Sequence, residues 1–478
     1  MKELLNQING FLWGPWMLAF MLGTGLFLLV RTRFLPIRNL GYALRCIVTA
    51  EPGGKQAGGG KQAGRNKQVS GVGRCMPASE RDAGISALAS LTTELAATIG
   101  TGNIIGVATA MVLGGPGALV WMMIAAFLGM STKFAESMLS VKYRHVEADG
   151  SFVGGPMYML AKGFPCRKVG KILSVLFAFF AVAASFGMGN MTQANSIAVS
   201  IYEAYGIPPA KTGLVLSVLV ILAVLGGIGA ISKVTVYLVP GMALFYVIGT
   251  MGIVMAHREM LPEVLLEMVE TAFSFEAMGG GIGGSAMRWG IARGVFSNEA
   301  GLGAAGITAA AARTDSPVRQ GYVSMTGVFF DTILLCTLTG LAIACSGVLG
   351  LRDEAGMLLT GAELMMAAFS TVFGAAGAKL VGISITLFAF ATIIAWEYQG
   401  ECAFCFLAGK KEYGIYYRFV YGLVALLGAV WGLETVWTLS DIANALLAIP
   451  NLIGVIALSG IVKKEILTYD KKLKKSGL

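Results

Sequence analysis

Charged residues are scarce in this chain of 478 residues. Only 13% are Asp, Glu, Lys or Arg, against ~25% in an ordinary soluble domain, and 56% are hydrophobic. So few charges could not cover the surface of a soluble globule. Long apolar runs recur along the whole sequence, each close to the ~20 residues that cross a bilayer as a helix. The sequence therefore predicts an all-α, multi-pass membrane protein.

Cysteine and histidine are too few, and too scattered, for a metal or redox site. Cys402 and Cys405 form a CxxC, but no second pair accompanies them among the seven cysteines. His145 and His257 stand far apart in loop-like sequence. The motifs HExxH and GxSxG are absent, as are paired intramembrane aspartates. We therefore expect no enzyme, no catalytic residue and no cofactor.

The net charge of +9 would suit a nucleic-acid-binding protein, but the basic residues follow the membrane rule instead. They gather in the first loop, in the loop from Lys142 to Lys171, and in the tail after Val462, whereas the segment from Glu259 to Glu276 is acidic. Eleven spans are expected, at 13–30, 85–112, 117–141, 170–200, 212–230, 234–256, 280–311, 320–347, 379–408, 416–432 and 438–462. This predicts a cell inner (plasma) membrane protein with its N-terminus outside and its C-terminus in the cytoplasm.

The second span carries two glycines at its centre, in Ile99-Gly100-Thr101-Gly102-Asn103. Glycine lowers the cost of leaving helical geometry. Lipid excludes unpaired backbone, so a broken helix has to line a polar cavity or pack against protein. One interpretation is a ligand site at half-helix ends; the other is a packing face formed by Gly102 and Gly106.

The seventh span favours the ligand site. It places Ser297, Asn298 and Glu299 beside Gly301 and Gly303, also at mid-membrane. The first break lies in a span running outward and the second in a span running inward, five spans later. Interrupted helices at matching positions of two opposite-facing halves indicate an inverted-repeat secondary transporter. An ion channel, the rival class, predicts pore-lining rings instead.

Several stretches then resemble the alanine or glycine:cation symporter family. They are LAATIGTGNIIGVATAMVLGGPGALVWM, KFAESMLSVKYR, DGSFVGGPMYML, GNMTQANSIA, WGIARGVFSNEAGLGAA, FDT and LFAFATIIAWEYQGE, in family order over about residues 85–460. The resemblance implies a leucine-transporter-like fold with two inverted five-helix repeats and one extra N-terminal helix, about 11 spans in all. It also implies sodium-coupled uptake of a small neutral amino acid such as alanine or glycine.

The expected organisation follows from the resemblance and the spans together. It comprises an extra transmembrane helix (1–31), a basic cytoplasmic linker loop (32–83), the first repeat (84–256), an external loop with an amphipathic helix (257–279), the second repeat (280–462) and a basic tail (463–478). The expected partners are the amino acid, the sodium ion and the lipid bilayer, with no nucleic acid. We expect the chain to act as a monomer.

The resemblance assigns substrate contacts to matching positions. Thr101, Gly102 and Asn103 would meet the carboxylate and amine of the amino acid, opposite Gln193. The second break would contribute Phe296 as an aromatic wall, with Ser297 and Asn298 beside it; Trp396 would close the side-chain end of the pocket. From the residues alone, Phe296 and Trp396 are better explained as packing aromatics, which fill any helix bundle.

The resemblance also implies a sodium site between the first break and the ninth span. Its ligands would be backbone oxygens near Ala96 and Ile99 and the hydroxyl of Thr392. The family usually has two adjacent hydroxyl residues, whereas this chain has Ala391 before Thr392. The alternative is therefore a proton-coupled permease of the same fold.

Charged residues inside spans are costly and face protein or water. Lys133 and Glu136 are three apart and can pair with each other. Asp331 could cap a broken helix, pair with an intramembrane arginine, or carry a proton. Arg288 and Arg293 could serve an outer gate or partner Asp331. Glu94 could join an inner gate or extend to the cytoplasm.

Overall fold

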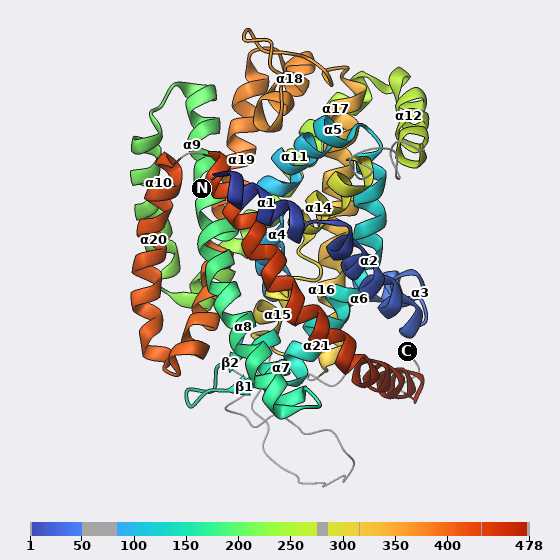
Figure 1. The fold of residues 1–478 in the computed structure, drawn as a ribbon, viewed down its shortest axis with the longest axis vertical. Helices are drawn as coiled ribbons and strands as arrows, with labels where there is room; N and C mark the ends of the chain where they lie inside the picture. Colours follow the sequence, from blue (N-terminus) through green and yellow to red (C-terminus); the bar gives the residue numbers. More distant parts are fainter. Residues whose placement is uncertain (1, 50–83, 275–284, 315, 432, 476–478) are drawn as a thin grey trace, which may run out of the picture.

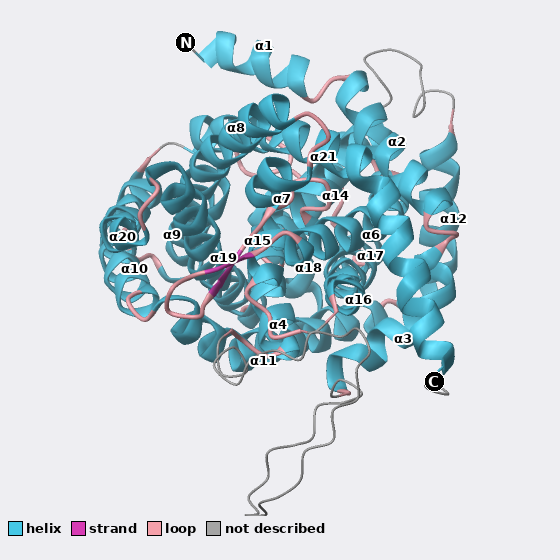
Figure 2. Cartoon of the chain, turned by 90° about the horizontal axis from the view of Figure 1, so that it is seen from below, coloured by secondary structure: helices cyan, strands magenta, loops and turns pink. Residues whose placement is uncertain are grey.

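The computed structural model describes residues 2–49, 84–274, 285–314, 316–431 and 433–475. Most helices run roughly along the long axis of the molecule (Figure 1), and Figure 2 shows the bundle along that axis. The described part is helical apart from a two-stranded hairpin, β1 (His145–Val146) with β2 (Phe152–Val153), and isolated bridges. The predicted all-α membrane architecture is confirmed.

The helices follow in chain order. They are α1 (Lys2–Leu12), α2 (Pro15–Arg31), α3 (Leu35–Val48), α4 (Ala87–Thr98), α5 (Ile105–Gly114), α6 (Ala118–Lys142), α7 (Pro156–Gly163), α8 (Arg167–Phe186), α9 (Thr192–Tyr205), α10 (Pro209–Val224), α11 (Gly227–Ala256), α12 (Leu261–Phe273), α14 (Ser285–Asn298), α15 (Ala304–Ala310), α16 (Pro317–Val328), α17 (Thr337–Cys345), α18 (Gly361–Phe373), α19 (Ala376–Ala408), α20 (Gly414–Val430) and α21 (Leu433–Lys475).

Length and hydropathy identify eight helices in the described residues that can cross a membrane, or nine with the bent pair α4–α5. The predicted count of eleven is therefore not confirmed. One predicted span, α10, has only 16 residues. Another, α14–α15, is interrupted and carries Arg288 and Arg293, which lower its hydropathy.

Four helical spans are locally irregular at mid-bundle. The pair α4–α5 bends by 61° at its break. The second break separates α14 from α15. Two further spans contain π-helical turns, at Gly187–Met191 between α8 and α9 and at Phe329–Cys336 between α16 and α17. Such turns are rare and concentrate at functional sites.

The two ends of the bundle differ. Helices α12 and α18 lie at one end, and α7, the hairpin and the end of α21 lie toward the other (Figure 1). The amphipathic helix expected at Pro262–Phe273 is present as α12. The sequence did not predict α18, a 13-residue apolar helix too short to span, which packs against α5 and α19.

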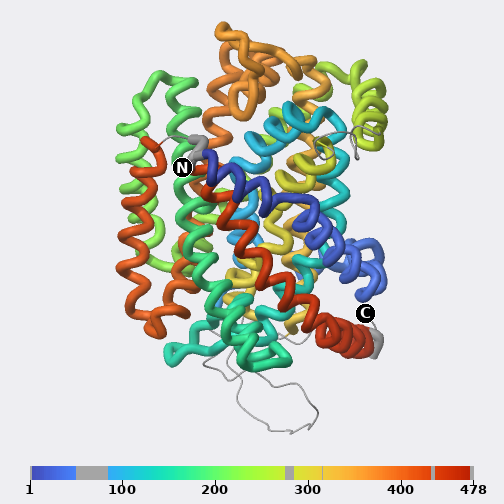
Figure 3. The backbone as a smooth tube through the Cα atoms, in the orientation of Figure 1, coloured from blue at the N-terminus to red at the C-terminus, as the bar shows by residue number. Residues whose placement is uncertain are grey.

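The segments outside the two halves also have structure. Helix α3 occupies Leu35–Val48, at the start of the predicted linker, while residues 50–83 lie outside the described residues. Helix α21 continues through the predicted tail to Lys475. Helices α1 and α2 run alongside α21, as the blue and red segments of Figure 3 show.

Candidate functional site

The first break unwinds between α4 and α5. Gly100 is extended, and Thr101–Asn103 form a single 3₁₀ turn. The side chain of Asn103 turns back, so that its Oδ1 accepts from the backbone N–H of Gly100 at 3.0 Å. A buried amide that would otherwise lack a partner is thereby satisfied. Thr101, Gly102 and Asn103 are all buried.

Gln193 approaches this turn from α9. Its Oε1 accepts from the backbone N–H of Thr101 at 3.3 Å, and its Nε2 donates to the carbonyl of Met188 in the neighbouring π-helical turn. The hydroxyl of Thr101 is buried and has no hydrogen-bond partner among the described residues. The turn thus holds a polar atom that a ligand could satisfy.

The second break depends on left-handed backbone. Glu299 has φ = 56°, uncommon for a residue with a side chain, and Gly301 and Gly303 have φ of 101° and 80°. Oδ1 of Asn298 accepts from the N–H of Ala300 at 3.0 Å. The unwound residues between α14 and α15 therefore form an ordered turn.

Two polar side chains from other helices bind the carbonyls exposed by this break. Nζ of Lys133 donates to the carbonyl of Asn298 at 2.9 Å, and Nδ2 of Asn451 donates to that of Gly301, also at 2.9 Å. Asn451 also donates to Glu136 at 2.6 Å. Lys133 and Glu136 therefore do not form the ion pair that their spacing allows; each bonds to a different group.

The two breaks meet directly. A Cβ atom on Gly102 would lie 3.1 Å from Cα of Ser297 and 3.3 Å from Cδ1 of Phe296. Asp331, from the π-helical turn after α16, lies beside them. Its carboxylate accepts from Asn103 Nδ2 at 2.7 Å and from Ser297 Oγ at 2.9 Å. Asp331 thus links a side chain of the first break to one of the second. The hydrogen bonds that its carboxylate accepts in the described residues come from side chains, so it does not cap the backbone of either broken helix.

Trp396 lies on α19 behind the second break. It is fully buried, and its Nε1 donates to Oε1 of Glu299 at 2.7 Å. A Cβ on Gly189 would lie 2.5 Å from Cβ of Trp396, so only glycine fits opposite the indole. Asn298, the remaining predicted contact, donates to Thr332 at 3.1 Å.

The three predicted sodium ligands converge. Oγ1 of Thr392 lies 3.0 Å from the carbonyl oxygen of Ala96 and 3.5 Å from that of Ile99. It also lies 3.1 Å from the carbonyl of Phe388 in its own helix. A Cβ on Gly100 would lie 2.5 Å from the same hydroxyl, so a side chain there would fill this space. Uncharged oxygens at the end of an unwound helix suit a sodium ion.

An aromatic and charged layer separates the two breaks from an open cavity. Phe296 stacks on Trp437 with ring centroids 5.2 Å apart. Arg293 lies against both rings and pairs with Asp441 at 2.9 Å. Of the two expectations for Arg293, the pairing with Asp331 is wrong, because Arg293 pairs with Asp441; the outer-gate role stays a prediction.

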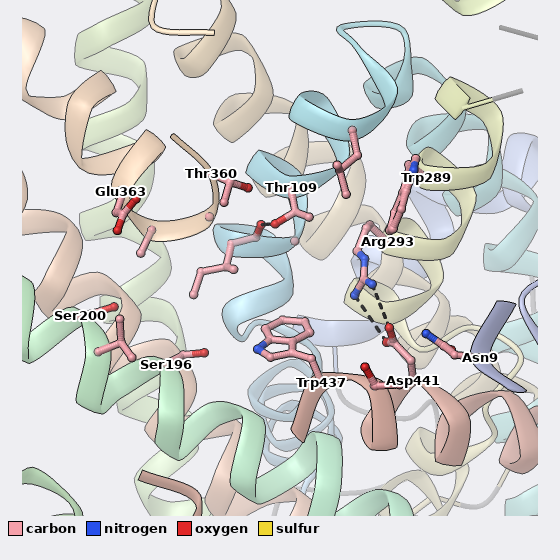
Figure 4. A pocket seen from close by; sticks show the side chains of 17 residues that line it. Asn9, Thr109, Ser196, Ser200, Trp289, Arg293, Thr360, Glu363, Trp437 and Asp441 are labelled. Atoms are coloured by element: carbon pink, nitrogen blue, oxygen red, sulfur yellow. Dashed lines mark hydrogen bonds and ion pairs between the residues drawn. The ribbon is translucent and has the colours of Figure 1, made fainter. Parts of the chain in front are cut away.

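The cavity has a volume of about 550 Å³, and Figure 4 shows Arg293, Asp441 and Trp437 in its wall, opposite Thr360 and Glu363 of the α18 region. None of the predicted substrate contacts lines it; Phe296 among them belongs to the aromatic layer, stacked on Trp437, which does line the cavity. Trp437 and Asp441 were not predicted from the sequence. The available signal for Asp441 was a carboxylate inside the last predicted span with no basic residue near it in the sequence.

The opposite side is closed by backbone pairing. The N–H of Ile85 donates to the carbonyl of Ala311 at 3.1 Å, and the N–H of Arg313 donates to the carbonyl of Ile85 at 2.8 Å. Arg144 donates to the carbonyl of Ala312 at 2.7 Å. Glu94 does not extend to water: it is buried and accepts from Ser90 at 3.0 Å and Gln320 at 3.3 Å.

Comparison with known proteins shows which family this chain resembles. The model of the "Sodium:alanine symporter family" matches residues 1–477. The sodium/alanine symporter AgcS of Methanococcus maripaludis is 44% identical over 472 residues, covering 98% of this chain and 97% of the relative.

Among solved structures, MhsT in complex with L-phenylalanine aligns with a TM-score of 0.57 at 14% identity, over 79% of this chain and 89% of that one. Mhp1, a nucleobase-cation-symport-1 family transporter in a closed conformation with bromovinylhydantoin bound, aligns with a TM-score of 0.50 at 12% identity, over 74% of each chain. The fold is thus the leucine-transporter-like fold.

Proposed function

Because the chain belongs to the sodium:alanine symporter family, we propose that it couples the entry of sodium to the uptake of a small neutral amino acid, such as alanine or glycine. The observation that carries this proposal is the convergence of the Thr392 hydroxyl on the carbonyls of Ala96 and Ile99. These oxygens lie where α4 unwinds, directly before the turn that would hold the substrate.

The turn at Thr101–Asn103 is suited to an amino acid carboxylate. Backbone N–H groups at the start of a half-helix, with the positive end of its dipole, favour a negative group. The unpartnered hydroxyl of Thr101 adds a donor. Gln193, whose bond to Thr101 is a long 3.3 Å, would exchange that bond for contact with the substrate.

The far wall restricts the size of the substrate. Phe296 covers Gly102 closely, and Trp396 is fully buried between Gly189 and Glu299. Ser297 and Asn298 present polar groups beside them. A methyl group or a hydrogen suits this wall better than a longer side chain, which supports alanine or glycine as substrate.

The coupling of sodium to substrate follows from the position of Gly100, which alone separates Ile99 of the sodium site from Thr101 of the substrate site. Sodium bound to the carbonyls of Ala96 and Ile99 would fix the backbone that presents Gly100 and Thr101 to the carboxylate. Each ligand then stabilises the conformation that the other needs, which is reciprocal positive coupling. Alternating access would open first the Phe296–Trp437 layer and then the pairing of Ile85 with Ala311.

We also propose a monomer in the inner (plasma) membrane, with the N-terminus outside and the C-terminus in the cytoplasm. Both breaks and all the proposed contacts come from one chain, which supports the monomer. The basic end of α21 lies toward the same end of the bundle as the hairpin, opposite α12 and α18 (Figure 1). The excess of Lys and Arg at that end supports a cytoplasmic location.

The test is uptake of labelled alanine by the purified protein in proteoliposomes. An inward sodium gradient at equal pH should drive accumulation, and a potassium gradient of the same size should not. Unlabelled glycine and serine should compete, and larger amino acids should compete poorly. Uptake that persists unchanged without sodium, and that follows an imposed pH gradient, would instead identify a proton-coupled permease.

A further inference from the structure

A second buried ionic cluster lies on α19, one residue beyond Trp396, and the proposed transport cycle does not use it. It consists of Glu397 and Glu401 of α19 and Arg418 of α20. Arg418 forms a two-pronged ion pair with Glu401, with Nε to Oε2 at 2.9 Å and Nη2 to Oε1 at 2.8 Å. Its Nη1 donates to the carbonyl of Leu225 at 2.9 Å. The guanidinium is therefore committed to partners other than Glu397.

Glu397 has no such partner. Its side chain is 0% exposed, and its Oε1 lies 4.0 Å from Nε of Arg418. Neither of its carboxylate oxygens has a hydrogen-bond partner among the described residues. An ionised carboxylate left without a hydrogen-bond donor in a buried site is strongly destabilising. The surroundings of Glu397 therefore favour the protonated, uncharged carboxyl group over the carboxylate.

Beyond Arg418, no lysine or arginine in the part of the chain that the structure describes forms an ion pair with Glu397 or Glu401, although Lys410 and Lys411 line the adjacent cavity. The titratable groups around the pair are Tyr398, Cys402 and Cys405 on α19, and Tyr417, Tyr421 and Arg418 on α20. Tyr421 donates to the carbonyl of Ile393, and Tyr417 shares a hydrogen bond with Ser185. Lys411 pairs with Asp149 outside the bundle at 2.6 Å, and this contact holds the pKa of Asp149 below its usual range.

One proton balances this cluster. Two carboxylates beside one guanidinium leave a single excess negative charge. Glu397 and Glu401 are four residues apart on α19, and both carboxyl groups lie beside the guanidinium of Arg418. Two carboxylates cannot bond to each other unless one of them carries a proton, and acids that share a site hold one in common.

We propose that Glu397 and Glu401 form a carboxyl pair that binds one proton, with Arg418 fixing Glu401 as the acceptor. The proton exchanges through a cavity of about 470 Å³, which Glu401 and Arg418 line together with the hairpin residues His145 and Glu147. Loss of the proton leaves a buried negative charge on α19, the helix that also carries Thr392 and Trp396. The proton therefore stabilises the packing of α19 on α20.

Infrared spectroscopy of the purified protein tests the pair without requiring transport. A protonated carboxyl group has a carbonyl band that is distinct from the carboxylate bands and shifts in heavy water. Wild type minus Glu397→Gln should show the loss of one such band. Wild type minus Glu401→Gln should show the same loss, because Arg418 is then free to pair with Glu397 as an ion. Glu147→Gln, in the wall of the same cavity, is the matched control and should leave the protonated bands unchanged.

Two outcomes would overturn the proposal. If Glu397→Gln keeps every protonated band, Glu397 is ionised in the native protein. If that variant loses a band but Glu401→Gln keeps it, the proton belongs to Glu397 alone and there is no pair. Size-exclusion chromatography shows whether each variant is folded. If Glu397→Gln fails to fold, retention or loss of the band in Glu401→Gln decides the question.

Discussion

The two helix breaks are stabilised by different chemistry. The backbone of the first is held by the amide side chains of Asn103 and Gln193. The second exposes its carbonyls to Lys133 and Asn451, and its own Glu299 holds Trp396. A neutral break can offer carbonyls to a cation and N–H groups to a carboxylate without repelling either. The difference therefore suggests that the first break binds ligands and the second forms a fixed wall.

The largest effect is expected at Asn103, because this one side chain stabilises the first break and is linked through Asp331 to the second. Asn103→Ala removes the cap of Gly100 and the bonds to Asp331. It should weaken alanine binding on the order of 100-fold, because each buried bond lost costs ~1–3 kcal/mol. Binding of labelled alanine to purified, folded protein measures it.

Asn451→Ala is the matched substitution at the second break. It should lower the thermal unfolding temperature, because the carbonyl of Gly301 and the carboxyl of Glu136 each lose a donor. Alanine affinity should change much less than in Asn103→Ala. Equal losses of affinity in the two variants would contradict the division of roles between the breaks.

Trp396→Ala should relax specificity, since it removes a fully buried indole from the wall. Uptake of a larger neutral amino acid, such as leucine, should rise relative to alanine by about 10- to 50-fold, the scale of size discrimination by an apolar pocket. Competition uptake gives the ratio. Trp396→Phe is the control: it loses the bond to Glu299 but keeps an aromatic wall, and should stay selective. An unchanged profile in Trp396→Ala would remove its proposed role.

The sequence predicted both breaks because paired glycines and polar residues recur at matching positions of two otherwise apolar spans. It could not place Asp331, because three roles were compatible with a lone buried carboxylate until its neighbours Asn103 and Ser297 were known. Trp437 and Asp441 were missed for the same reason. They meet Phe296 and Arg293 across more than a hundred residues, and only tertiary structure reveals such pairs.

Hydropathy also limited the span count. The segments α14–α15 and α10 were counted as membrane spans together with the long apolar helices. However, α14 carries two arginines and α10 is short. A break that binds polar groups necessarily lowers the hydropathy of its own span. The polar residues that a binding site needs therefore weaken the hydropathy pattern by which its span is recognised.

The cation site tests the first break more finely. Thr392→Val keeps the shape of the side chain but removes the hydroxyl that meets Ala96 and Ile99. The sodium concentration for half-maximal uptake should rise about 10-fold, since a bond to a charged group contributes ~1.5–3 kcal/mol. Thr392→Ser retains the hydroxyl and should stay near wild type. Equal behaviour of the two variants would show that sodium binds elsewhere.

The smallest effect is expected from adding a second hydroxyl group beside Thr392, at position 391. Ala391 is fully buried on α19, beside Thr392, at the position where the family resemblance implies a second hydroxyl. Ala391→Ser adds one oxygen and should lower the sodium concentration for half-maximal uptake about 3-fold, because part of any gain is offset by burying a new hydroxyl. Ala391→Gly changes the size of the side chain without adding an oxygen, and should not reproduce the gain. A gain seen only with serine would mean that α19 supplies ligands from adjacent positions, and that this chain works with a weaker cation site at its first break.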